Sequence, residues 1–124
     1  MRGPEAKLYQ KLKKATPKII WNRIENISVP GMPDVLGYNK NNKFFTVELK
    51  VTKSKKIRLS PHQIAFHVRH PKNSFILVKS LALNTVKLYE GASCLQLAAS
   101  GLTLDALREG LDACCSYLDQ ELVA

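Results

Sequence analysis

Acidic side chains are scarce in the N-terminal part of this chain. Residues 1–87 contain 4 acidic residues against 18 lysines and arginines, whereas residues 88–124 contain 6 acidic residues and 1 arginine. The formal net charge of the whole chain is +9 at pH 7. A positive field of this kind attracts polyanions, and counterion release makes nucleic acid the expected partner.

The sequence also lacks the features of secreted, membrane and multidomain proteins. No apolar run is long enough to span a membrane, the charged N-terminus has no apolar signal stretch, and no linker or repeat divides the chain. The three cysteines, Cys94, Cys114 and Cys115, are an odd number at no metal-ligand spacing, which is typical of a reducing compartment. The 124 residues therefore predict one cytoplasmic domain, over residues 1–124, without membrane contact.

Hydrophobic periodicity predicts an α/β fold, a central mixed β-sheet flanked by helices in the order αβββαββαα. We expect helices at about 4–15, 60–70, 93–99 and 104–118, and strands at about 19–27, 34–38, 43–51, 74–80 and 85–89. The core would span about residues 5–90, with a C-terminal helical part at about 91–124. The apolar stripe of the last helices either packs on this core or forms a dimer interface.

Two of the expected strands carry a set of residues suited to metal chemistry. Asp34 opens the strand at 34–38, and Glu48-Leu49-Lys50 follows thirteen residues later in the next strand. Alternation along a strand puts Glu48 and Lys50 on one face, about 7 Å apart. If the strands pair, Asp34 approaches Glu48 at the open end of the hairpin. Two carboxylates so placed, with the Leu49 carbonyl between them, suit Mg²⁺, and a lysine beside them suits a reacting phosphate.

The segments GMPDVLGY, FFTVELKV and LSPHQIAF occur in this order. They resemble the motifs of the PD-(D/E)XK nuclease superfamily, closest to its virus-type replication-repair (VRR-NUC-like) and Holliday-junction-resolvase-like branches. The resemblance covers about residues 5–80. It implies a restriction-endonuclease-like core in which Asp34 and Glu48 are metal ligands and Lys50 is the catalytic lysine. It also implies a role in DNA repair or recombination in a viral or bacterial setting, in the host cytoplasm if viral.

Three further residues have a possible place in such a site. Gln63 matches a glutamine that supports the active site in these nucleases, but it also completes a capping box with Ser60, and one side chain does not easily do both. Glu5 corresponds to a first-helix glutamate that contributes to a metal site in resolvase-like members, or it compensates the helix dipole. Glu25 either enters the outer shell of a metal or pairs with Arg23.

Basic side chains and three histidines supply candidate contacts to nucleic acid. The basic loop that follows Lys50 is placed to bind phosphates, and we extend this prediction to two arginines outside it; the set is Lys53, Lys55, Lys56, Arg58, Arg69 and Arg23. His62, His67 and His70 share one expected helix, where they either hold zinc or meet phosphates beside Arg69.

These observations predict a Mg²⁺-dependent DNA endonuclease, with Mn²⁺ as a substitute, that hydrolyses phosphodiesters without a covalent intermediate or a nucleotide cofactor. The short chain leaves no module for reading base sequence, so branched DNA such as a four-way junction is the expected substrate, and two paired cuts would suit a homodimer. Two alternatives stay open. One is a non-catalytic nucleic-acid-binding module on the same fold, and the other is a restriction-type duplex nuclease.

Overall fold

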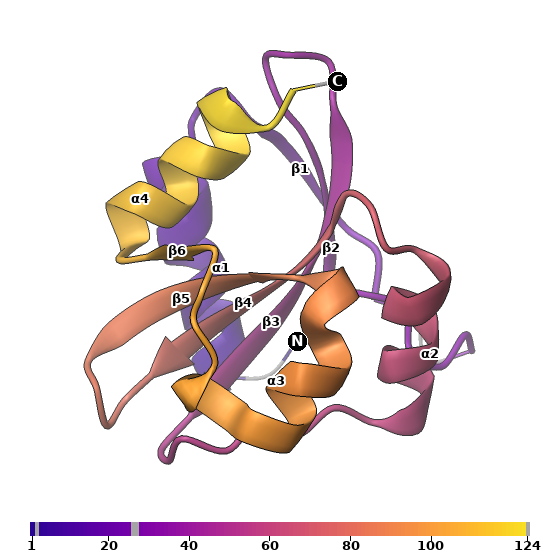
Figure 1. The fold of residues 1–124 in the computed structure, drawn as a ribbon. Coiled ribbons are helices and arrows are strands. Elements are labelled where there is room, and N and C mark those ends of the chain that lie inside the picture. Colours follow the sequence, from indigo (N-terminus) through magenta and orange to yellow (C-terminus); the bar gives the residue numbers. More distant parts are fainter. Residues whose placement is uncertain (2, 26–27, 124) are drawn as a thin grey trace.

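The computed structural model describes residues 1, 3–25 and 28–123. Its centre is a six-stranded sheet in the order β1-β2-β3-β4-β5-β6 (Figure 1). The strands are β1 (Ile20–Arg23), β2 (Val35–Tyr38), β3 (Phe44–Thr52), β4 (Ser74–Ser80), β5 (Thr85–Glu90) and β6 (Arg108–Glu109). The α-helices are α1 (Gly3–Ala15), α2 (Pro61–Arg69), α3 (Cys94–Ser100) and α4 (Leu111–Ser116), with short turns of other helix types at Gly91–Ser93, Gly101–Thr103 and Tyr117–Glu121.

The sheet is mixed, because β3 and β4 are parallel while every other neighbouring pair is antiparallel. Helices cover both faces. On one face, α1 and α4 share a buried cluster that contains Leu12, Leu49 and Leu118. On the other face, α2 and α3 lie over a second cluster, which contains Ile76 and Leu97. The predicted fold class, a mixed sheet between helices, is therefore confirmed.

The C-terminal part differs from the prediction. A single helix was expected over 104–118, but α4 begins only at Leu111, and the preceding segment pairs with β5 as the short edge strand β6. The Leu107 N–H donates to the Leu88 carbonyl at 2.8 Å, and the Gly110 N–H donates to the Val86 carbonyl at 2.7 Å. The leucine spacing that suggested a helix serves both faces of the sheet instead, because Leu104 packs against the α2-side cluster and Leu107 against the α1-side cluster.

The last helix packs on the chain's own core. Cys114 and Cys115 are buried and free, and Leu118 has no exposed surface. Burial raises the pKa of the Cys114 thiol to about 12, which disfavours the thiolate that a nucleophile needs. Of the two alternatives for this apolar stripe, the structure shows the packed one. Within the described part of the chain, no helix is long and apolar enough to cross a membrane.

A close contact across β1, β2 and β3 sets how tightly this end of the sheet packs. Trp21, Gly37 and Phe45 lie side by side in register, and the Trp21 and Phe45 rings meet edge to face with centroids 5.5 Å apart. A Cβ added at Gly37 would lie 2.5 Å from a ring carbon of Phe45. Because Phe45 is buried, its ring has little room to move aside.

We therefore expect Gly37→Ala to destabilise the protein by about 1–3 kcal/mol, the usual cost of overpacking a core. Urea unfolding would measure the loss. Gly3→Ala is the matched control, since a Cβ at Gly3 meets nothing within 4 Å. Equal stability of the two variants would contradict this account of the packing.

Candidate active site

Two carboxylates lie close together where β2 begins beside β3. Val35 pairs with Val47, so Asp34, the residue before β2, lies next to Glu48. The Leu49 N–H donates to Asp34 Oδ2 at 2.8 Å and so orients this carboxylate. The N–H and C=O of a strand residue point toward the same neighbour. The Leu49 carbonyl therefore also faces the space before the first residue of β2, beside Asp34.

Glu48 is buried, with 4% of its surface exposed. Its Oε2 accepts a hydrogen bond from Gln63 Nε2 at 3.2 Å, while its buried Oε1 has no partner among the described residues. Burial and then the negative charge of Asp34 raise the pKa of Glu48 far above its ordinary value, although Lys50 acts in the opposite direction. Two like charges held this close, one of them buried, repel each other when both are ionised.

Gln63 joins the two functional residues of β3 to the start of α2. Its Oε1 accepts from Lys50 Nζ at 3.1 Å and from the Ser60 N–H at 3.0 Å, and its Nε2 donates to Glu48. The Gln63 N–H in turn donates to Ser60 Oγ, which completes the capping box. The expectation that one side chain does not easily cap α2 and also contact Glu48 and Lys50 was wrong, because a carbonyl oxygen has two lone pairs and the amide nitrogen remains free to donate.

The residues at this point fit a hard divalent cation. Asp34 and Glu48 supply carboxylate oxygens and Leu49 a carbonyl oxygen, the donor types that Mg²⁺ takes, with its remaining positions left to water and phosphate. The partnerless Glu48 Oε1 is the observation that supports the fit. In the described ranges, no group of three His, Cys, Asp or Glu side chains is placed to share a metal. A site here would therefore depend on two acids.

Glu5 lies on the Lys50 side of this arrangement. It lines a cavity of about 360 Å³ together with Lys50 and two residues of the basic loop, Lys56 and Arg58. The structure thus brings Asp34, Glu48, Leu49, Lys50 and Gln63 together and places Glu5 beside the lysine, outside any three-acid cluster of described residues. A metal-binding role for Glu5 stays a prediction.

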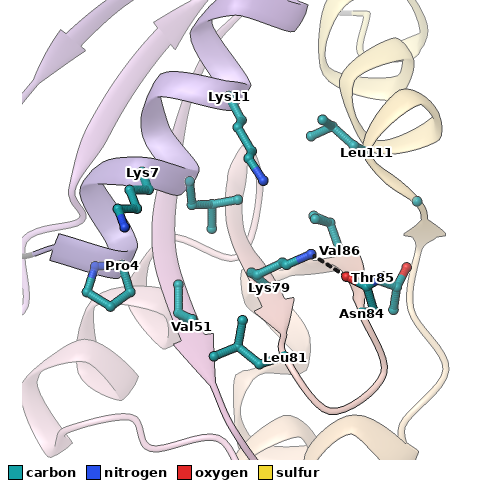
Figure 2. Close-up of a pocket in the computed structure, with 12 residues that line it drawn as sticks. Pro4, Lys7, Lys11, Val51, Lys79, Leu81, Asn84, Thr85, Val86 and Leu111 are labelled. Atoms are coloured by element: carbon teal, nitrogen blue, oxygen red, sulfur yellow. Dashed lines mark hydrogen bonds between the residues drawn. The ribbon is translucent and has the colours of Figure 1, made fainter.

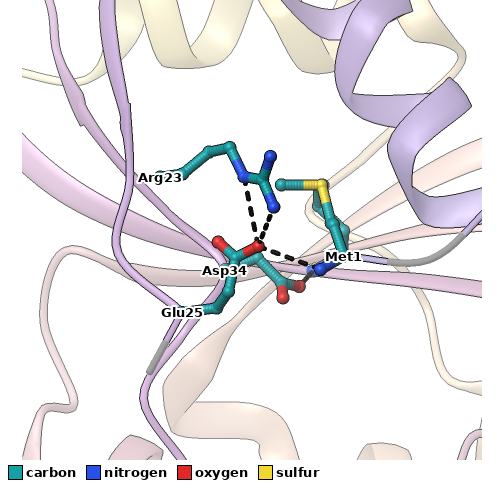
Figure 3. Close-up of polar contacts among 5 residues, drawn as sticks. Met1, Arg23, Glu25 and Asp34 are labelled. Atoms are coloured by element: carbon teal, nitrogen blue, oxygen red, sulfur yellow. Dashed lines mark hydrogen bonds and ion pairs between the residues drawn. The ribbon is translucent and has the colours of Figure 1, made fainter. Parts of the chain in front are cut away.

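Arg23 and Glu25 form an ion pair next to Asp34 (Figure 3). Arg23 donates to Glu25 Oε1 at 2.6 Å, and the amino group of Met1 donates to the same oxygen at 2.9 Å. The hydrogen bond from Arg23 holds the pKa of Glu25 at about 2, so this carboxylate stays charged. Its pairing with Arg23 is the second of the two roles considered for Glu25. Arg23, a predicted nucleic-acid contact, remains more than half exposed.

The basic loop between β3 and α2 is exposed, and a backbone hydrogen bond from Leu102 fixes its Lys55 carbonyl. Lys53, Lys55, Lys56 and Arg58 all face solvent, as does Arg69 at the end of α2. Lys50, Arg58 and Gln63 line one cavity of about 600 Å³.

The Leu102 N–H donates to the Lys55 carbonyl at 2.7 Å, and a Cβ at Gly101 would lie 2.1 Å from that oxygen. No local pattern in the sequence marks this contact, because its partners lie more than forty residues apart.

His67 is the residue whose position differs most from its prediction. It has no exposed surface, and its Nδ1 is hydrogen-bonded to the Ser74 hydroxyl. The predicted phosphate contact by His67 was therefore wrong. Its place is in the packing of α2 against β4. Burial, with smaller contributions from His70 and Lys50, lowers the pKa of His67 to about 4.

No family model and no curated protein matches the sequence. Among solved structures, a match is found to Hjc of Archaeoglobus fulgidus, a Holliday junction resolvase from an archaeal hyperthermophile. The two folds are alike. The TM-score is 0.54, with 18% sequence identity, and the match covers 71% of this chain and 74% of Hjc. The likeness to Hjc is one of fold, and it agrees with the nuclease-type core that the sequence motifs imply. The VRR-NUC-like branch stays a prediction.

We expect Glu48→Gln to stabilise the metal-free protein, by about 1 kcal/mol or more at pH 8. Glutamine keeps an acceptor for Gln63, offers an N–H to Asp34 and removes the like charge. The gain should grow as pH rises above about 4.3, where Glu48 ionises in the unfolded chain but resists ionisation in the folded one. Urea unfolding in EDTA at pH 5 and pH 8 measures it, with exposed Glu90→Gln as the control. Equal stability of Glu48→Gln and the wild type at pH 8 would contradict the cost of burial and like-charge repulsion assigned to Glu48.

The buried His67 should make the protein sensitive to acid. Since its folded pKa lies below the unfolded value of about 6.5, the unfolded chain binds the extra proton first, and stability falls as pH drops from about 6.5 to about 4. The loss attributable to His67 is about 3 kcal/mol. Stability measured against pH should show a shallower decline in His67→Asn than in the wild type. Parallel curves would refute the assignment.

Proposed function

We propose that this protein is a metal-dependent DNA endonuclease that acts on branched DNA. The observation that carries the proposal is the arrangement at the start of β2 beside β3, where Asp34, the buried Glu48 and Lys50 lie close together. One Glu48 oxygen there has no partner among the described residues. A purely DNA-binding protein has no use for two acids held beside a lysine in a basic surface. The fold likeness to Hjc, named a Holliday junction resolvase, supports the same choice.

In this proposal, the chain's own residues have separate tasks. The Asp34 and Glu48 carboxylates and the Leu49 carbonyl would hold Mg²⁺, or Mn²⁺ in its place. The bound ion would supply a Lewis acid and lower the pKa of an attacking water. Lys50, held by Gln63 Oε1, brings positive charge to the phosphate as charge develops there. Gln63 is a positioning residue, because it links Lys50 and Glu48 through one amide.

The exposed cations around the site would bind the DNA backbone. Lys53, Lys55, Lys56 and Arg58 lie on the loop that leads away from Lys50, and the exposed Arg69 and Arg23 lie at the ends of α2 and β1. Contacts of this kind position a duplex without reading its sequence. Recognition by backbone and shape suits a branched substrate, and two paired cuts in a four-way junction would suit a symmetric homodimer.

We expect wild-type protein to cut a labelled four-way junction in Mg²⁺ and in Mn²⁺ but not in EDTA. Asp34→Asn and Lys50→Met should each lower the cleavage rate at least about 100-fold, the range found when a single charge-stabilising group is removed. Single-turnover assays on a junction, a flap, single strands and linear duplex would measure the rates. Preference for the duplex would favour a restriction-type nuclease instead.

The control variants are matched in charge. Asp105→Asn and Lys40→Met change exposed residues outside the site, so both should cut at the wild-type rate. Binding of the junction by gel shift separates loss of chemistry from loss of affinity. Tight binding of the junction by wild-type protein without cutting, in every metal tested, would overturn the proposed enzyme activity. It would favour the non-catalytic binding module instead.

A further inference from the structure

A second concave site lies on the face of the sheet that α1 covers. The cavity has a volume of about 490 Å³ and opens between α1, the ends of β3, β4 and β5, and the start of α4 (Figure 2). This volume is in the range of sites that take small ligands or peptide side chains. Much of its lining is aliphatic, from Pro4, Leu8, Val51, Leu81, Val86 and Leu111.

Three lysines surround this aliphatic lining. Lys7 and Lys11 lie one turn apart on α1, and Lys79 comes from β4 (Figure 2). In the part of the chain that the structure describes, none of the three forms an ion pair, and Lys79 donates a hydrogen bond to the neutral Asn84 at 3.3 Å. An occupant with an apolar body and several negative charges would therefore complement both parts of the site.

The lining also indicates which class of anion fits. A nucleobase binds by stacking on aromatic rings, and no aromatic side chain lines this cavity in the described residues. A fatty acid carries a single carboxylate, whereas three ammonium groups from two elements surround this cavity. An acidic peptide with one large aliphatic side chain satisfies both the apolar lining and the separated charges.

We propose that this cavity, defined by Lys7, Lys11, Lys79 and Leu111, is a docking site for an acidic segment of a partner protein that inserts an aliphatic side chain. The site is separate from the two carboxylates. Val51, which lines it, also lines the cavity that contains Glu5 and Lys50, so the two cavities are neighbours. A docked segment would hold its protein next to the candidate active site. The proposal does not depend on nuclease activity.

The test uses amide chemical shifts of the ¹⁵N-labelled full chain, titrated with a capped pentapeptide, EELEE. We expect shifts concentrated in α1, β5 and the start of α4, and weaker binding at higher salt. Lys11→Glu should weaken binding at least tenfold, and Leu111→Trp, which fills the cavity, should do the same. Lys14→Glu is the matched control, because Lys14 is exposed on α1 but outside the cavity.

Three comparison probes decide the chemistry: EEGEE, dodecanoate and a single-stranded DNA dodecamer. Weaker binding by all three than by EELEE supports the proposal. Equal binding by EEGEE would show attraction by charge alone, and tighter binding by dodecanoate or DNA at the same amides would show another class of ligand. Any of these results would overturn the proposal, as would the absence of shifts at millimolar EELEE or equal weakening by Lys14→Glu.

Discussion

Parallel pairing of β3 with β4 requires the connection between them to cross the sheet, and α2 lies in that crossing. The crossing places α2 over the face of β3 that carries Glu48 and Lys50, with Gln63 in its first turn directly above them. The same helix buries His67 against Ser74 of β4. The candidate site therefore depends on this pairing. A hairpin of β2 and β3 alone would present the same acids and lysine to solvent without a common support.

The surroundings of Glu48 disfavour its ionised form. A buried carboxylate loses its hydration, and the neighbouring Asp34 carries a like charge that the protein does little to offset. Gln63 satisfies one of the two Glu48 oxygens and Lys50 only partly compensates the charge. An electrostatic cost of this kind is typical of functional sites, where stability is lost to hold reactive groups ready. The nearby Arg23–Glu25 pair differs, because its charges neutralise each other locally.

The two faces of the sheet present positive charge in different settings. On the α2 side, the lysines and Arg58 of an exposed loop lie beside polar and acidic groups, an arrangement suited to a phosphate backbone and a metal. On the α1 side, Lys7, Lys11 and Lys79 surround an aliphatic cavity. A nucleic-acid strand has no aliphatic side chain that could fill it. The excess of basic residues in 1–87 therefore has more than one structural consequence, and net charge alone does not separate them.

Local patterns were sufficient for much of the fold and for the core of the site. Alternation in FFTVELKV put Glu48 and Lys50 on one face because side-chain direction in a strand repeats every two residues, and Ser60 with Gln63 marked the start of α2 because capping is a contact within one turn. The remaining features needed contacts between distant residues. The spacing of Leu104 and Leu107 suits a helix or an edge strand, and only hydrogen bonding to β5 decides between them. The burial of His67 depends on Ser74, and the Gln63 partners Glu48 and Lys50 come from β3. Only tertiary structure decides such contacts, since spacing along the chain does not specify which partner is near.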